Sequence, residues 1–204
     1  MISAKSVKEL RDSTGAGMMD CKKALVETAG NVDEAINYLR KSGIAKAEKK
    51  SGRSTMDGVI EYYIHQGSKL GVLLEVNCET DFVAKTDGFS DLAHNISMQI
   101  AATNPLTISR DEIDQSLLDK EKEIFTDQAK ESGKPKEIID KIVEGRFEKY
   151  YAESCLLEQQ FIKDPDRKIS DLMSDAVSTL GENIVINRFS RFSVGESNLT
   201  GKSK

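Results

Sequence analysis

The stretch that decides the fold is VIEYYIHQGSKLGVLLEV, residues 59–76. Its two halves, Val59–His65 and Leu70–Val76, are rich in β-branched and aromatic residues, which favour strands. The polar residues His65–Lys69 include a glycine and are typical of a hairpin turn. The segment therefore predicts two antiparallel strands within a chain whose other patterns are mostly helical.

Three short helices are expected before the hairpin. Asn31 and Glu34 have the spacing of a capping box and predict the start of the third helix, which Gly43 is expected to end. The basic residues 44–53 that follow are interpreted as a linker. The boundary signals expected at the first two helices are Ser3, Gly15 and Asp20.

The rest of the chain predicts helices and one more strand. An amphipathic helix is expected from Phe89 until shortly before Pro105, and a last strand over Ile184–Val194 can complete a three-stranded antiparallel sheet. Two long helices, opened by Ser109–Glu112 and by Pro135, are expected to form a helical hairpin around Ser132–Lys134, and Gly181 is expected to cap a further helix. The pattern predicts an α+β fold with a three-helix module over residues 1–53, a core over 54–196 and a flexible tail over 197–204.

Composition argues against several classes of protein. The 204 residues carry a net charge of −5, whereas a nucleic-acid binder normally has a basic face. No apolar run approaches the roughly 20 residues that span a bilayer, and residues 1–11 lack a signal-peptide pattern. We therefore expect a cytoplasmic protein that binds neither nucleic acid nor membrane. The three cysteines, Cys21, Cys78 and Cys155, are far apart, and we expect neither a disulfide nor a metal site.

Nothing in the sequence predicts an enzyme or a cofactor. His65 and His94 have no nucleophile in a recognisable setting near them. The segment from Gly195 to Ser203 ends in Gly-Lys-Ser, but five residues separate Gly195 from Gly201 where a phosphate-binding loop has four.

Two segments invite a functional interpretation. Met18 and Met19 are adjacent at a helix start and cannot both face one core stripe, so core packing and partner contact are equally open for them. Thr80 can cap a short helical turn that carries Asp81 and Phe82 at its tip. Phe82 either binds in a partner's pocket or folds back under the helix near Phe89, and the usual burial of large apolar side chains favours the second alternative.

Both segments resemble signatures of the elongation factor Ts family. The first is LRDSTGAGMMDCKKAL, residues 10–25, and the second is LEVNCETDFVA, residues 74–84. Shorter matches are SGKP at 132–135, VEGR at 143–146 and RFSVGE at 191–196. One departure is Gln159-Gln160-Phe161, where many relatives have Gln-Pro-Phe.

The resemblance implies a guanine nucleotide exchange factor that binds elongation factor Tu in its GDP form and makes or breaks no bond. It implies that the N-terminal module has the ubiquitin-associated (UBA) type of fold. It also implies a short architecture, which we expect to form a homodimer through the core. The partner-binding residues that it implies are Arg11, Met18, Met19, Thr80, Asp81, Phe82 and Val83.

The alternative is a helical protein-interaction module on an α+β scaffold without exchange activity. In that case residues 1–53 would bind the ligand by themselves, and Asp81 and Phe82 would be dispensable.

Overall fold

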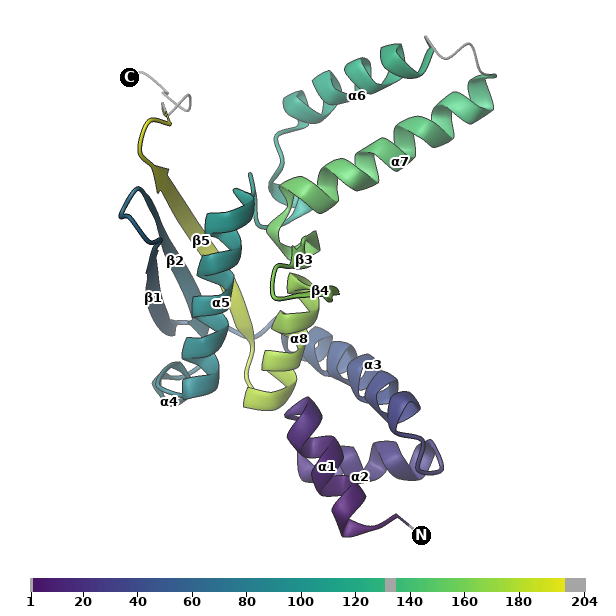
Figure 1. Cartoon of the computed structure of the whole chain (residues 1–204), viewed down its shortest axis with the longest axis vertical. Helices are drawn as coiled ribbons and strands as arrows, with labels where there is room; N and C mark the ends of the chain where they lie inside the picture. Colours follow the sequence, from purple (N-terminus) through teal and green to yellow (C-terminus); the bar gives the residue numbers. More distant parts are fainter. Residues whose placement is uncertain (1, 131–134, 197–204) are drawn as a thin grey trace. The chain divides into compact units, whose positions relative to one another are not determined.

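The computed structural model describes residues 2–130 and 135–196, and within them it contains eight α-helices and five strands (Figure 1). Contacts group the chain into two compact units. The first comprises Met1–Tyr62, Leu73–Asn95 and Ser170–Phe189, and the second comprises Tyr63–Val72, Ile96–Ile169 and Ser190–Lys204. The domain boundaries at residues 53 and 196 stay predictions. The expected turn at Ser132–Lys134, the tail and its Gly-Lys-Ser segment lie outside the described residues.

The N-terminal module has three helices, α1 (Ala4–Thr14), α2 (Met18–Glu27) and α3 (Val32–Lys50), which fit the UBA-like architecture. Two expected caps are confirmed. The Ser3 hydroxyl accepts a hydrogen bond from the Ser6 amide at 3.0 Å, and the Asn31 side chain accepts one from the Glu34 amide at 3.2 Å. Gly15 ends α1 with a φ of 68°, a value that glycine adopts readily. The module's core consists of Val7, Leu10, Cys21, Ala24, Leu25 and Ala35.

The boundary expected at Gly43 is wrong, because α3 continues to Lys50. Gly43 is buried, and a Cβ atom there would lie 3.7 Å from the Cβ of Ser178 in α8 (Ile169–Leu180), an ordinary van der Waals distance. Gly43 therefore faces a neighbouring helix from within α3 instead of ending α3. The basic segment interpreted as a linker is helical to Lys50, whose ammonium group donates to the carbonyl of Val177 at 3.3 Å.

The predicted three-stranded antiparallel sheet is confirmed. Its strands are β1 (Asp57–Ile64), β2 (Leu70–Cys78) and β5 (Ile184–Ser193), in the order β1-β2-β5. The hairpin closes where the His65 amide donates to the Leu70 carbonyl at 2.9 Å, and Gly67 and Ser68 turn the chain with positive φ values of 85° and 55°. Residues 59–76, whose composition favours strands, thus form the predicted hairpin.

Side chains on the two faces of this sheet differ in burial. In the first unit the buried apolar residues include Leu74 and Val76 of β2, Phe89 and Leu92 of α5 (Asp87–Thr103), and Met173 and Val177 of α8. Leu73 points to the opposite face, because successive strand residues alternate, and it is exposed. We call Ile60, Tyr62, Leu73 and Val185 the exposed sheet face.

The second unit contains the helical hairpin of α6 (Gln115–Lys130) and α7 (Lys136–Ser154). The rings of Phe125 and Phe147 meet edge to face, with 5.3 Å between their centroids. The guanidinium of Arg110 binds Glu148 through two hydrogen bonds of 2.8 and 2.9 Å and lies 4.3 Å from the centre of the Tyr151 ring. The capping pair Ser109–Glu112 opens a short 3-10 turn, Arg110–Glu112, rather than α6 itself.

A small hairpin of β3 (Gln160–Phe161) and β4 (Asp164–Lys168) was not predicted. Gln99, which is fully buried, stabilises it through its amide nitrogen, which donates to the Gln159 side chain and the Gln160 carbonyl, each at 3.1 Å. Its amide oxygen accepts from the Ile162 amide at 2.9 Å. Both amide hydrogens and the amide oxygen of this buried side chain therefore have partners, as burial requires.

Candidate partner-binding site

Two groups of residues make up the candidate site, and the first lies at the start of α2. Met18 is 43% exposed and Met19 is 74% exposed, and Arg11 on α1 is also exposed. We call these three residues the methionine edge. Core packing, one of the two alternatives for the methionines, is therefore wrong, and both side chains are accessible to a partner.

The loop before the methionines is held by local hydrogen bonds. The Thr14 hydroxyl donates to the Leu10 carbonyl at 2.7 Å, which ties the end of α1 to its preceding turn. The Cys21 thiol donates to the Ala16 carbonyl at 3.6 Å from inside the module's core. The residues of the methionine edge thus flank a loop whose backbone is held by hydrogen bonds from residues close to it in sequence.

Asp20 does not cap α2, because Gly17 occupies the N-cap and Asp20 lies in the first turn. Its carboxylate instead pairs with the Lys46 ammonium at 2.7 Å. A carboxylate in the first turn also interacts favourably with the helix dipole. The ion pair joins α3 to the start of α2 directly beside Met19.

The second group is the tip, which consists of Thr80, Asp81, Phe82 and Val83 around the four-residue helix α4 (Asp81–Ala84). Phe82 is 80% exposed, while Val83 is half-buried and Ala84 is buried. The favoured alternative, in which Phe82 folds back under the helix of Phe89, is therefore wrong. A ring this exposed is unusual for its size, and such residues often fill a pocket in a partner.

The charge at the tip is paired. The Lys85 ammonium donates to the Asp81 carboxylate at 2.6 Å, one helical turn further along. This hydrogen bond, together with the positive charge of Lys85, lowers the pKa of Asp81, and the same contact raises the pKa of Lys85. Asp81 is thus ionised at neutral pH and lies beside the exposed ring of Phe82.

The residue that holds the tip was missed in the sequence. Glu182, just after α8, accepts hydrogen bonds from the amides of Glu79 and Thr80 at 3.1 and 3.0 Å and from the Thr80 hydroxyl at 2.6 Å. Thr80 is the N-cap of α4, but its side chain makes no capping bond because its hydroxyl is engaged by Glu182. The only sequence signal was a glutamate next to the helix-ending Gly181.

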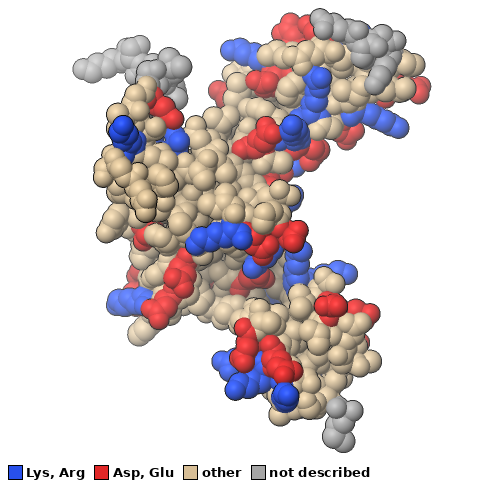
Figure 2. All heavy atoms as spheres, viewed as in Figure 1, with Lys and Arg blue, Asp and Glu red and all other residues tan. Residues whose placement is uncertain are grey.

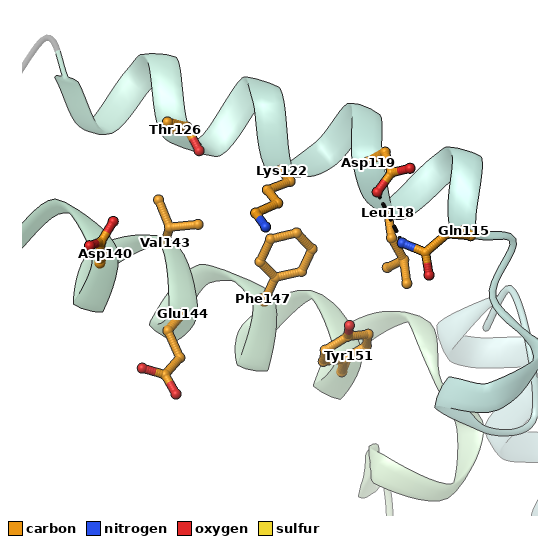
Figure 3. Close-up of a pocket in the computed structure, with 10 residues that line it drawn as sticks. All are labelled: Gln115, Leu118, Asp119, Lys122, Thr126, Asp140, Val143, Glu144, Phe147 and Tyr151. Carbon is orange, nitrogen blue, oxygen red and sulfur yellow. Dashed lines mark hydrogen bonds between the residues drawn. The ribbon is translucent and has the colours of Figure 1, made fainter.

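A pocket of about 500 Å³ lies elsewhere, between α6 and α7 in the second unit (Figure 3). Lys122 of α6 extends toward Phe147 of α7, and Gln115 bonds to Asp119 at 3.0 Å. None of its lining residues is a histidine or a cysteine. Among the described residues His94 does contact a carboxylate, Glu61, at 3.1 Å, but neither residue lines this pocket.

On the face of the molecule in Figure 2, acidic and basic side chains lie interspersed. None of the helices within residues 2–130 and 135–196 is long and apolar enough to cross a bilayer.

Comparison with known proteins decides the family. The profile of the family described as Elongation factor TS matches residues 2–196. The chain belongs to the elongation factor Ts family. It is 56% identical to elongation factor Ts of Thermoanaerobacter sp. (strain X514), with 96% of both chains covered. It is 57% identical to that of Syntrophomonas wolfei and 55% identical to that of Herpetosiphon aurantiacus, over 96% of this chain and 92% and 99% of theirs.

Membership of an elongation factor family gives the protein a role in translation elongation, and hence in protein biosynthesis. The match includes the methionine edge, the tip and Glu182.

Proposed function

We propose that the protein is a guanine nucleotide exchange factor that binds elongation factor Tu in its GDP form and promotes release of GDP. The observation that carries this proposal is the exposed ring of Phe82, on a short helix whose N-terminal backbone is held by Glu182. The protein supplies binding energy and changes no covalent bond.

The two residue groups have different roles in this proposal. The methionine edge docks on the GTPase domain of the partner, where adaptable methionine side chains suit a protein surface. The tip inserts near the elements that bind the nucleotide and its magnesium ion. Phe82 supplies apolar contact there and Asp81 supplies negative charge, while Thr80 and Val83 flank these two residues in the tip.

Thermodynamic linkage gives the mechanism. A factor that binds the nucleotide-free partner more tightly than the GDP-bound partner must weaken GDP binding by the same ratio. An acceleration of about 10,000-fold requires about 5.5 kcal/mol, at roughly 1.4 kcal/mol per factor of ten. Burial of one phenylalanine supplies at most about 3 kcal/mol. Phe82 alone is therefore insufficient, and further contacts with the partner have to contribute the remainder.

The proposal is tested by titrating the chain into nucleotide-free and GDP-bound elongation factor Tu. We expect much tighter binding to the nucleotide-free form, and a loss of GDP affinity by the same factor when the chain is present. Equal affinity for both forms would reject exchange and favour the alternative, a helical interaction module on a scaffold. In that case Asp81 and Phe82 could be replaced without effect.

The proposed assembly is a homodimer formed through the core. The exposed sheet face is apolar, and Figure 2 shows the region of β1 and β2 as largely uncharged on the face in view. Pairing of two copies about a two-fold axis buries such a face. The three cysteines are free and buried, so we expect no disulfide between the two copies.

Light scattering under reducing conditions measures the oligomeric state. We expect a mass about twice the 22.6 kDa of one chain, and a single-chain mass for the Tyr62→Arg variant. Leu106→Arg, at an exposed apolar residue outside the exposed sheet face, is the matched control and keeps the double mass. A mass of one chain for the unaltered protein at all concentrations would reject the dimer and leave the exchange proposal standing.

A further inference from the structure

Hydrogen bonds from two glutamates connect the segment before the tip to the segment after α8. The two residues are Glu79 and Glu182. The Glu182 carboxylate accepts three hydrogen bonds from Glu79 and Thr80, as described above. In the other direction, the Glu79 carboxylate accepts from the Asn183 amide at 2.6 Å. Each glutamate thus accepts hydrogen bonds from backbone amides in the segment of the other glutamate. We call these four hydrogen bonds the glutamate clasp.

The clasp also includes the end of α3. The Asn183 side-chain amide donates to the carbonyls of Ser51 and Arg53 at 3.3 and 2.9 Å, and the Arg53 guanidinium lies 3.4 Å from the Glu79 carboxylate. The hydrogen bond from the Asn183 backbone amide is the main cause that lowers the pKa of Glu79, and the charge of Arg53 lowers it further. This carboxylate therefore stays ionised at neutral pH. Three segments far apart in the sequence therefore meet at one group of charge-assisted hydrogen bonds.

The position of these contacts suits control of the tip. Glu79 and Thr80 directly precede Asp81 and Phe82, and the Thr80 hydroxyl is held by Glu182 rather than by α4. Phe82 is too exposed to be fixed by packing in the core of its own chain. The direction of its ring thus depends on the backbone before it. A backbone fixed in advance loses less conformational entropy on binding, which favours the bound complex.

We infer that Glu182 is a positioning residue for the exchange reaction: it fixes the backbone of Glu79 and Thr80 so that Asp81 and Phe82 project in the orientation that the partner accepts. This inference rests on the proposed exchange function. Glu182 acts through the tip and touches neither partner nor nucleotide.

The test measures release of labelled GDP from elongation factor Tu at increasing concentrations of full-length chain. Glu182→Gln keeps the size of the side chain but removes its negative charge and replaces one of its two acceptor oxygens with an amide group that only donates. We expect the saturating release rate to fall about tenfold, the effect of losing one hydrogen bond to a charged acceptor. The half-saturating concentration should change less than about threefold, because the methionine edge still docks. Glu153→Gln, in an exposed ion pair with Lys149, is the matched control and keeps the full rate.

A double-mutant cycle separates positioning from a general structural role. If Glu182 acts through the tip, Glu182→Gln should change the rate less than about twofold in a Phe82→Ala background, because the ring it positions is absent. The same tenfold loss in both backgrounds would overturn the inference, as would a full rate for Glu182→Gln alone. If the unaltered chain leaves GDP release unchanged, the exchange proposal itself fails, so the two failures are distinguishable.

If Glu182→Gln does not fold, two milder variants at Thr80 test the same positioning role of Glu182. Thr80→Val removes only the 2.6 Å bond to Glu182, and Thr80→Ser keeps its hydroxyl. We expect Thr80→Val to lower the saturating rate about threefold and Thr80→Ser to restore it. A full rate for Thr80→Val would contradict the inference.

Discussion

The methionine edge and the tip both present apolar side chains to solvent, but they are held in place by different means. The residues of the methionine edge flank a loop that is held by neighbours in the sequence, through Thr14, Cys21 and the apolar core of a small module. The tip is fixed by Glu182, which is 102 residues from Thr80. The methionine edge is thus held by contacts between residues close in sequence, whereas the tip depends on contacts that form only when the whole unit is folded.

This difference separates docking from exchange. We expect a surface held by neighbours in the sequence to suit initial binding, because its contacts do not involve distant segments. A ring that must project in one direction requires long-range support. We therefore expect changes in the methionine edge to alter the half-saturating concentration of the chain, and changes in the tip to alter the saturating rate of GDP release.

The largest effect is expected for Phe82→Ala. Loss of a buried contact of up to about 3 kcal/mol corresponds to a decrease of about a hundredfold in the saturating release rate. Thermal unfolding should be unchanged, because the ring is exposed in the free chain. Leu106→Ala removes another exposed apolar side chain and should leave both measurements unaltered. A lowered melting temperature for Phe82→Ala would show that the ring belongs to the chain's own core.

An intermediate effect is expected when Met18 and Met19 are both replaced by alanine. The half-saturating concentration should rise about tenfold while the saturating rate changes little, because two flexible apolar side chains are lost from the docking surface. Circular dichroism should show an intact module. Val26→Ala, at another exposed residue of α2, is the control. Intact binding of the double variant would remove the methionine edge from the site.

The smallest effect concerns the charge at the tip. Lys85→Ala removes the hydrogen bond and the charge that lower the pKa of Asp81, so that pKa should rise toward the ordinary aspartate value of about 3.9. Because the folded pKa of Asp81 lies below its unfolded value, this pair contributes stability above the unfolded pKa and loses it as the pH falls through the folded pKa. Carboxylate titration by NMR measures the shift, and an unchanged pKa would show that the ion pair does not form in solution.

Sequence patterns predicted the features whose determinants are close together in the chain. The caps at Ser3 and Asn31 and the β1–β2 hairpin depend on contacts within a few residues, and all are confirmed. Gly43 was misassigned because a glycine in a helical pattern is usually an end signal. Here Gly43 lies inside the helix and faces Ser178, a residue of another helix that no local pattern could reveal.

The candidate site divides in the same way. The adjacent methionines predicted an exposed residue because a helix cannot turn both toward one core. The average burial of phenylalanine gave the wrong environment for Phe82, because an average over many proteins does not fix the exposure of one side chain. Glu182 could not be found, since its three hydrogen bonds join segments more than a hundred residues apart.

The measurement that tests the central claim most directly is release of labelled GDP from elongation factor Tu at increasing concentrations of this chain, with excess unlabelled GTP present. The release rate should rise with chain concentration to a plateau far above the rate without the chain, and GTP should not be hydrolysed by the chain alone. A release rate that stays constant, although the titration shows the partner to be saturated with chain, would contradict exchange as the function of this protein.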